Sequence, residues 1–182
     1  MRPFLIGIGG AKSGIGKTEA ACNILRSIDG LGAIKCTKTA IYSSVIDDPY
    51  ILGQKDKDTS RFIEAGARAV LWVQSTSEDM PETLEMAVDR LAYLDGLLIE
   101  GNSAIEVLKP DIVIFILGDG ASSLKRGAER TLDMADAVVY KGEKGAMDCV
   151  LLEKPLFDIE DTAGYVKLIK EALDERHTDR KD

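Results

Sequence analysis

The chain has 182 residues, of which 45% are hydrophobic and 30% are charged, and this length and composition predict a single soluble globular domain. The net charge of -8 argues against non-specific nucleic-acid binding, because the sequence contains no basic stripe that could neutralise phosphates. No apolar run is long enough for a transmembrane helix, and three widely spaced cysteines without a C-x-x-C pair predict reduced thiols in a cytoplasmic protein without membrane contact.

A phosphate-binding loop is predicted after the first apolar run. Phe4 to Ile8 reads as a strand buried on both faces. Ala11 to Thr18 then fits the pattern G-x-x-x-x-G-K-[ST], with alanine in place of the first glycine. Glycines let the N–H groups of such a loop turn inward around an anion, and the helix that follows adds the positive end of its dipole. The expected nucleotide contacts are Ser13, Gly14, Ile15, Gly16, Lys17, Thr18 and Glu19.

Two lysines of this loop are expected to act on the phosphates. Lys17 supplies a flexible positive charge for the β and γ phosphates, and the Thr18 hydroxyl beside it is placed to ligate Mg²⁺. The segment from Lys12 also resembles the deviant phosphate loop K-G-G-x-G-K-[ST], with Ser13 in place of the first glycine. In proteins with that loop, the first lysine reaches the phosphates of the opposite monomer. The resemblance implies that Lys12 is a second catalytic lysine in a homodimer. The alternative is that it contacts only its own subunit's phosphates, or none.

A helix, a second strand and a long polar segment follow. Apolar residues at positions i, i+3, i+4 and i+7 predict the helix: Ala21, Ile24, Leu25 and Ile28. Residues 33–37 form a short strand-like run. Residues 38–57 are polar and rich in turn formers, and two interpretations are open for them. They form either a switch segment with carboxylates near Mg²⁺ and the γ phosphate, or a solvated acidic turn around Asp47 and Asp48.

The next stretch alternates helix and strand. Residues 58–67 read as a short helix that is capped by Asp58 and stopped by a glycine, and residues 69–73 read as an apolar strand. Pro81 opens a further helix. Its apolar positions predict core packing and nothing more: Leu84, Ala87, Val88 and Leu91.

A second chemically informative stretch is residues 95–102, an apolar strand that ends in Glu100 followed by glycine. This is the form of a Walker B element, and the carboxyl end of a central strand is where open α/β sheets bind ligands. We expect Glu100 to hold Mg²⁺ through water or to orient an attacking water, and the alternative is a carboxylate that caps the next segment. The candidate Mg²⁺ ligands are Thr18, Asp58 and Glu100.

A partial guanine-reading loop is predicted at the end of a later strand. Residues 111–117 form a buried strand, and after a turn and a helix residues 135–143 form another. A strand that ends in N-K-x-D places its aspartate to accept two hydrogen bonds from guanine. Here Tyr140 replaces the asparagine, Lys141 remains and Glu143 stands for the aspartate. Lys141 and Glu143 are therefore expected to favour GTP over ATP, but only modestly.

Strands alternate with helices along the whole chain. This alternation predicts an α/β fold of the P-loop NTPase type, with a mostly parallel sheet and helices on both faces. A last amphipathic helix is predicted over residues 163–173. We predict one nucleotide-binding domain over residues 1–174 and a frayed, charged tail over residues 175–182.

Three stretches together resemble the MobB family, the small nucleotide-binding partner in molybdopterin-guanine dinucleotide biosynthesis. They are the phosphate loop, the K-D-T-S-R-F-I-E-A-G-A sequence of residues 57–67 and the I-E-G of residues 99–101. The family pattern runs K-D-S-x-R-x-x-E-A-G-A, and this chain has Thr59 in place of its serine. The family pattern also has a strand followed by Lys-His, which residues 34–36 follow with Lys35 as the lysine and Cys36 in place of the histidine. The histidine-bearing segment that comes next in the family is absent. The resemblance covers about the first 117 residues.

The resemblance implies a GTP-binding, weakly hydrolysing accessory protein that requires Mg²⁺. It also implies a homodimer that works with a cofactor-processing enzyme. Two other functions are consistent with the same loop. One is a small-molecule kinase or an ATP-dependent ligase of the dethiobiotin synthetase type, and the other is a nucleotide sensor that binds without turnover.

Overall fold

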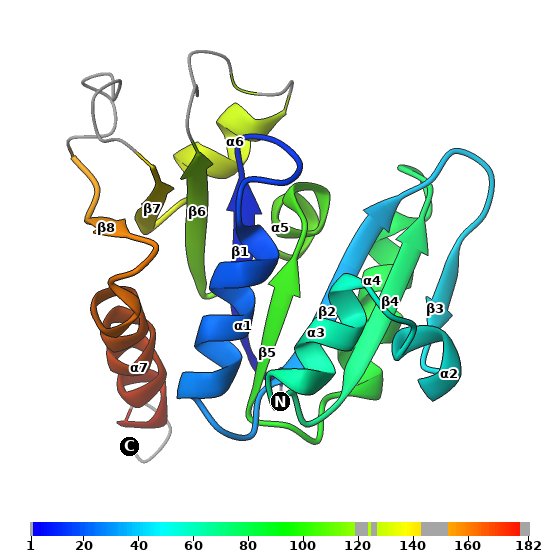
Figure 1. Cartoon of the computed structure of the whole chain (residues 1–182). Helices are drawn as coiled ribbons and strands as arrows, with labels where there is room; N and C mark the ends of the chain where they lie inside the picture. The colour runs from blue at the N-terminus through cyan, green and yellow to red at the C-terminus, as the bar shows by residue number, and fades with distance from the viewer. Residues whose placement is uncertain (1, 119–123, 125–126, 143–152, 179–182) are drawn as a thin grey trace.

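The computed structural model describes residues 2–118, 124, 127–142 and 153–178. Within them, the strands form one sheet in the order β3-β4-β2-β5-β1-β6-β7-β8 (Figure 1). Neighbouring strands run parallel, except that β3 is antiparallel to β4. The strands are β1 Phe4–Gly10, β2 Gly32–Lys38, β3 Ser44–Ile46, β4 Val70–Ser75, β5 Gly96–Glu100, β6 Ile112–Gly118, β7 Ala137–Lys141 and β8 Leu156–Asp158.

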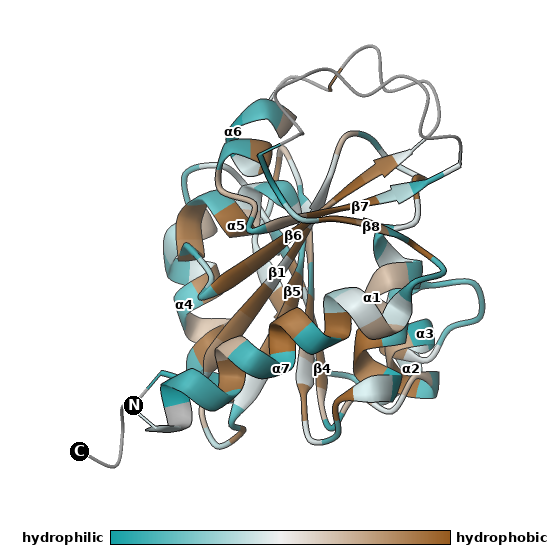
Figure 2. Ribbon diagram, turned by 90° about the vertical axis from the view of Figure 1, so that its left-hand side faces the viewer, coloured by the Kyte–Doolittle hydropathy of each residue, from teal (hydrophilic) through white to brown (hydrophobic). Residues whose placement is uncertain are grey.

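Helices cover both faces of the sheet (Figures 1 and 2). One face carries α1, which packs between α3 and α7, and the other carries α4, α5 and α6. The short helix α2 lies beside β4. This arrangement confirms the predicted fold class. The helices are α1 Lys17–Ser27, α2 Pro49–Leu52, α3 Asp58–Glu64, α4 Met80–Arg90, α5 Asn102–Leu108, α6 Ala128–Asp133 and α7 Thr162–Thr178.

The central strands are apolar because they are covered on both sides. Every residue of β1 and β5 is buried, and β6 is buried except at its last glycine. Figure 2 shows these strands as a hydrophobic layer between the helices. Each fully buried Leu or Ile contributes about 1.5–3 kcal/mol through removal of apolar surface from water. Glu100, at the end of β5, is the exception in this layer, since a carboxylate is buried there with only 1% of its surface exposed.

Several elements differ from the sequence prediction. The polar segment of residues 38–57 is not one irregular loop, because it contains β3 and α2. Residues 102–108 form α5, and residues 156–158 form an edge strand, β8. The two missed strands have three residues each, which is too short for a two-residue alternation to be recognised. The two short strands β3 and β8 extend the sheet at its two edges and leave its centre as predicted.

The last helix is longer than predicted. It ends at Thr178, so the tail expected from residue 175 is helical over its first four residues. Arg176 explains the extension, because its guanidinium contacts the Asp111 carboxylate at 3.0 Å and the carbonyls of Arg2 and Pro3. In the described part of the chain, no helix is both long and apolar enough to cross a membrane.

Candidate functional site

The predicted phosphate loop joins β1 to α1 at the carboxyl edge of the sheet (Figure 1). Gly14 and Gly16 have φ angles of 75° and 107°, a region that side-chain-bearing residues rarely adopt. Gly16 precedes α1 and supplies no side-chain cap, and the N-terminus of a helix is a favourable position for an anion. A Cβ atom at Gly16 would lie 3.0 Å from Ile159 Cδ1 and 3.4 Å from Lys141 Cδ. The loop therefore requires glycine at this position.

Hydrogen bonds hold both ends of the loop. Asn102, the first residue of α5, accepts from the Gly10 N–H and donates to the Gly10 carbonyl, both at 2.9 Å. The Ala11 N–H donates to the Ile116 carbonyl at 3.0 Å. Lys17 folds back over the loop and donates from Nζ to the Lys12 carbonyl at 2.7 Å. Asn102 is a residue of this site that no sequence pattern indicated.

The three predicted Mg²⁺ ligands meet beside this loop. The Thr18 hydroxyl lies 2.9 Å from Asp58 Oδ1 and 3.0 Å from Glu100 Oε2. A lysine that the sequence analysis missed completes the cluster. Lys35 Nζ lies 2.5 Å from Asp58 Oδ2 and 2.6 Å from Glu100 Oε1. The structure thus brings together a hydroxyl, two carboxylates and an ammonium from four different elements.

The sheet register explains how these groups meet. β2 and β5 are parallel neighbours in which Lys35 pairs with Glu100, so the two side chains lie on the same face. Glu100 also pairs with Ile8 of β1, close to the start of the phosphate loop. Asp58 was predicted to cap its helix, and this prediction is wrong. Lys57 is the residue before α3, and Asp58 directs its carboxylate to Thr18 and Lys35 instead.

The charges of the cluster stabilise one another. Burial disfavours the charged form of Lys35, but attraction to Glu100 and hydrogen bonds to both carboxylates outweigh it and raise the Lys35 pKa above 10.5. For Asp58, burial alone would raise the pKa. The hydrogen bond and charge of Lys35 and the hydrogen bond of Thr18 lower the Asp58 pKa below 3.8. At neutral pH the cluster therefore holds both groups in their charged forms.

The donor set fits Mg²⁺. This ion prefers hard oxygen ligands and is commonly held by one or two carboxylates together with substrate phosphates. Thr18, Asp58 and Glu100 supply such oxygens at the mouth of the loop. Among the described residues, no group of three or more His, Cys, Asp or Glu side chains could hold a metal by itself. The Thr18 hydroxyl would add a third oxygen ligand to the two carboxylates, and a phosphate or water would complete the coordination of a metal here.

The predicted base-reading residues are only partly described. Lys141, at the end of β7, pairs with Glu19 of α1, with 2.5 Å between Nζ and Oε2. This contact brings the end of β7 beside the phosphate loop. Glu143 lies outside the described residues. Lys12 and Ser13 are exposed on the loop, and Ile15 is buried beneath it.

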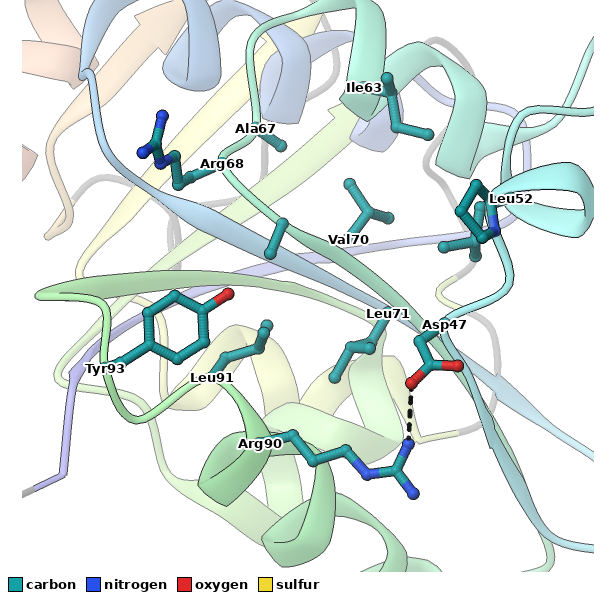
Figure 3. Close-up of a pocket in the computed structure, with 12 residues that line it drawn as sticks. Asp47, Leu52, Ile63, Ala67, Arg68, Val70, Leu71, Arg90, Leu91 and Tyr93 are labelled. Atoms are coloured by element: carbon teal, nitrogen blue, oxygen red, sulfur yellow. Dashed lines mark hydrogen bonds and ion pairs between the residues drawn. The ribbon is translucent and has the colours of Figure 1, made fainter.

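The acidic pair of residues 47 and 48 does not form part of this site. The antiparallel register of β3 places Asp47 beyond Ile46, toward the amino end of β4. Asp48 caps α2 by accepting from the N–H groups of Tyr50 and Ile51, as expected for an acidic turn. Asp47 lines a separate hollow of about 540 Å³, where it contacts Arg90 at 3.3 Å (Figure 3). The lining also includes Leu52, Ile63, Arg68, Val70, Leu71, Leu91 and Tyr93.

Cys36, which replaces the histidine of the MobB pattern, is not placed as a nucleophile. Its sulfur lies 3.5 Å from Met80 Sδ, and burial raises the pKa of its thiol to about 11. The positive charge of Lys35 opposes this shift without reversing it. A thiol of this kind is almost entirely protonated at neutral pH, so it reacts slowly.

We expect alkylation of Cys36 by iodoacetamide at pH 8 to be about 100-fold slower than that of a thiol with the ordinary pKa of 9.0, because the thiolate fraction falls by that factor. Peptide mass spectrometry of timed samples gives the rate at each cysteine. The same protein in urea is the control, since unfolding removes the burial. Rapid labelling of Cys36 in the native protein would contradict the assignment.

The fold is similar to that of several solved structures. HypB from Helicobacter pylori in complex with nickel superposes with a TM-score of 0.57 and 16% identity, over 96% of this chain and 88% of that chain. A plasmid partition protein from Borrelia burgdorferi gives a TM-score of 0.54 and 12% identity, over 94% of this chain and 100% of that chain. LpxK from Aquifex aeolicus in complex with ATP gives a TM-score of 0.51 and 13% identity, over 87% of this chain and 54% of that chain. At these identities the similarity shows a shared P-loop NTPase fold. No protein-family model and no curated protein matches the chain.

Proposed function

We propose that the chain binds a nucleoside triphosphate with Mg²⁺ at the loop between β1 and α1 and hydrolyses it slowly. The position of Thr18 carries this proposal. Its hydroxyl lies within 3.0 Å of carboxylates from α3 and β5, directly after a loop whose Gly14 and Gly16 have positive φ. A phosphate cradle and a set of hard oxygen ligands side by side are the two parts that phosphoryl chemistry requires. The P-loop NTPase fold of the solved neighbours supports the same function.

Each residue of the site has a distinct role in this proposal. Backbone N–H groups of the loop and of the first turn of α1 bind the phosphates. Lys17 exchanges the Lys12 carbonyl for the β and γ phosphates, while Thr18, Asp58 and Glu100 hold the metal. Bound Mg²⁺ offsets the charge of the phosphate oxygens. In the alternative role of Glu100, it would orient the attacking water and leave the metal to Thr18 and Asp58.

Thermal unfolding with and without nucleotide tests this binding. At a concentration one hundred times the dissociation constant, GTP or ATP with Mg²⁺ is expected to stabilise the protein by about 2.7 kcal/mol. Lys17→Ala is expected to remove most of that stabilisation, because the phosphates lose their main positive charge. A melting temperature that neither nucleotide changes, or an unaltered response in Lys17→Ala, refutes the proposed site.

We further propose that GTP is preferred over ATP by a modest factor. The contact between Lys141 and Glu19 supports this, because it brings the strand with the partial N-K-x-D sequence beside the loop. A carboxylate that pairs with the guanine edge would be left unpaired by adenine, which is unfavourable. Dissociation constants of both nucleotides in wild type and Glu143→Ala test this. Tighter ATP binding in the wild type, or unchanged discrimination in Glu143→Ala, excludes the preference.

We also propose that Lys12 acts on the nucleotide of a second subunit in a homodimer. The exposure of Lys12 at the loop and the K-x-G-x-G-K-T spacing support this role. A lysine that approaches only during phosphoryl transfer favours the transition state over bound substrate. Lys12→Ala is therefore expected to lower turnover far more than affinity, and turnover per subunit to rise with protein concentration. A mixture of Lys12→Ala and Lys17→Ala should regain activity, since one mixed site keeps both lysines. A proven monomer with a constant rate excludes this role.

The pathway we propose is molybdenum cofactor biosynthesis in the cytoplasm, where the chain would serve as an accessory factor to a cofactor-processing enzyme. The resemblance of residues 57–67 and 99–101 to the MobB pattern supports this. The test measures nucleotide turnover by the protein under three conditions: by itself, with small-molecule acceptors, and with a molybdopterin-processing enzyme. Stimulation by that enzyme supports the accessory role. Phosphoryl transfer to a small acceptor identifies a kinase or ligase instead, and binding without turnover identifies a sensor.

A further inference from the structure

Lys35 lies between the two carboxylates of the candidate Mg²⁺ site and divides their oxygens into two sets. Its ammonium forms ion pairs with Asp58 Oδ2 and Glu100 Oε1. The other oxygens, Asp58 Oδ1 and Glu100 Oε2, face the Thr18 hydroxyl. Each carboxylate therefore offers one oxygen to the metal position and one to Lys35. Lys35 is well enclosed, with 18% of its side-chain surface exposed, and Glu100 has 2%.

The oxygens that remain beside Thr18 suit an octahedral Mg²⁺. In a regular octahedron with metal–oxygen distances of about 2.0–2.1 Å, neighbouring ligand oxygens lie about 2.9 Å apart. The Thr18 hydroxyl lies 2.9 and 3.0 Å from the two carboxylate oxygens. At these two spacings the Thr18 hydroxyl and either carboxylate can bind the same small ion, provided that the carboxylate uses a single oxygen.

Ca²⁺ places different demands on the same residues. It takes six to eight oxygens at about 2.3–2.6 Å and often binds carboxylates through both oxygens. Such binding needs Asp58 Oδ2 or Glu100 Oε1, which Lys35 occupies. Groups that hydrogen-bond to metal ligands fix the orientation of those ligands and tune the metal site.

We propose that Lys35 is a positioning residue that keeps Asp58 and Glu100 in single-oxygen geometry and thereby makes the site selective for Mg²⁺ over Ca²⁺. This inference rests on the proposed function, because it concerns the metal that accompanies the nucleotide. Its observable is the ratio of the two metal affinities. Both ions carry the same charge, so the loss of a nearby positive charge changes both affinities in the same direction and largely cancels in the ratio. A change in the ratio then reports on ligand geometry.

The experiment is a thermal-unfolding titration of wild type, Lys35→Met and Lys35→Arg with Mg²⁺ and with Ca²⁺, each alone and with a non-hydrolysable GTP or ATP analogue. We expect Lys35→Met to shift the Mg²⁺-to-Ca²⁺ affinity ratio toward Ca²⁺ at least tenfold. Lys35→Arg keeps a charged donor for both carboxylates and is expected to retain most of the preference. Lys57→Met is the matched control, because Lys57 precedes Asp58 but places its ammonium 5.2 Å from the centre of the Trp72 ring. The Mg²⁺-to-Ca²⁺ affinity ratio of Lys57→Met should stay at the wild-type value.

Each result has a clear meaning. A Lys35→Met ratio within twofold of wild type overturns the role of Lys35 and leaves the nucleotide site intact. A wild type that Mg²⁺ stabilises neither alone nor with the analogue overturns the proposed function together with the metal site. If Lys35→Met does not fold, Lys35→Gln carries the same expectation, because its amide still donates hydrogen bonds but is one atom too short to span both carboxylates.

Discussion

Replacing Glu100 with alanine is expected to lower the free energy of unfolding by about 3 kcal/mol at pH 7. Glu100 is 1% exposed and contacts Lys35 at 2.6 Å and the Thr18 hydroxyl at 3.0 Å. Its removal leaves an enclosed ammonium with one carboxylate partner fewer, and loss of one member of a buried ion pair is strongly destabilising. Urea unfolding followed by circular dichroism measures the change, with an unaltered m-value as the check that unfolding remains two-state.

A surface ion pair gives the matched control for this prediction. Glu106 lies 3.8 Å from Arg130, whose side chain is 81% exposed, so Glu106→Ala is expected to cost at most about 0.5–1 kcal/mol. The free energy of unfolding of the wild type should also depend on pH through Asp58 and Lys35. Because the Asp58 pKa is lowered, the stability that its charge contributes is present above about pH 4 and disappears as the solution is acidified further. Because the Lys35 pKa is raised, its contribution is lost only above about pH 10.5. Equal costs for the two variants would contradict the buried cluster.

Replacing Gly16 with alanine is expected to abolish most nucleotide-dependent stabilisation. Gly16 has a φ angle of 107°, and a Cβ atom there would lie 3.0 Å from Ile159 Cδ1. A residue with a side chain in the left-handed conformation is strained by about 1–2 kcal/mol. The loop can relieve this strain only by changing the backbone conformation that binds the phosphates. Affinity for GTP or ATP with Mg²⁺ should fall at least tenfold. Melting curves recorded over a nucleotide titration measure this change.

Gly30→Ala separates backbone strain from loss of the site. Gly30 has a φ angle of 83°, and nothing lies within 4 Å of an added Cβ atom. It follows α1 at the end remote from the phosphate loop, so Gly30→Ala carries similar backbone strain without touching the site. Without nucleotide, the free energy of unfolding of Gly30→Ala should fall by about 1–2 kcal/mol, and its stabilisation by nucleotide should match that of the wild type. Equal responses of Gly16→Ala and Gly30→Ala would show that the loop does not bind the phosphates.

The parts of the site that depend on local sequence could be predicted. The loop from Ala11 to Thr18 lies between an apolar strand and an amphipathic helix, and both patterns span a few residues. Glu100 could be predicted for the same reason, because a carboxylate followed by glycine at a strand end is a local signal. Asp58 was predicted both as a metal ligand and as a helix cap; its carboxylate lies beside the Thr18 hydroxyl, and it is not the cap of α3. A carboxylate at the first turn of a helix suits both roles, and only tertiary contacts decide between them.

Lys35 and Asn102 could not be predicted, because their roles depend on contacts between distant parts of the chain. Lys35 is 65 residues from Glu100, and its position beside that carboxylate follows from the register of β2 against β5. Asn102 is 92 residues from Gly10, whose backbone it holds. In a sequence alone, a lysine within a strand and an asparagine after a glycine carry no such information. Short edge strands such as β8 are missed for a related reason, since three residues show no periodicity.

A calorimetric titration of wild type and Lys17→Ala with non-hydrolysable GTP and ATP analogues, with and without Mg²⁺, tests the central claim most directly. We expect one site per chain in the wild type, tighter binding with Mg²⁺ than without it, and a large loss of affinity in Lys17→Ala. Thr18, Asp58 and Glu100 explain the metal dependence, because their oxygens converge beside the loop. A wild type that takes up neither analogue, or a Lys17→Ala variant that binds as tightly as wild type, would contradict a nucleotide site at this loop.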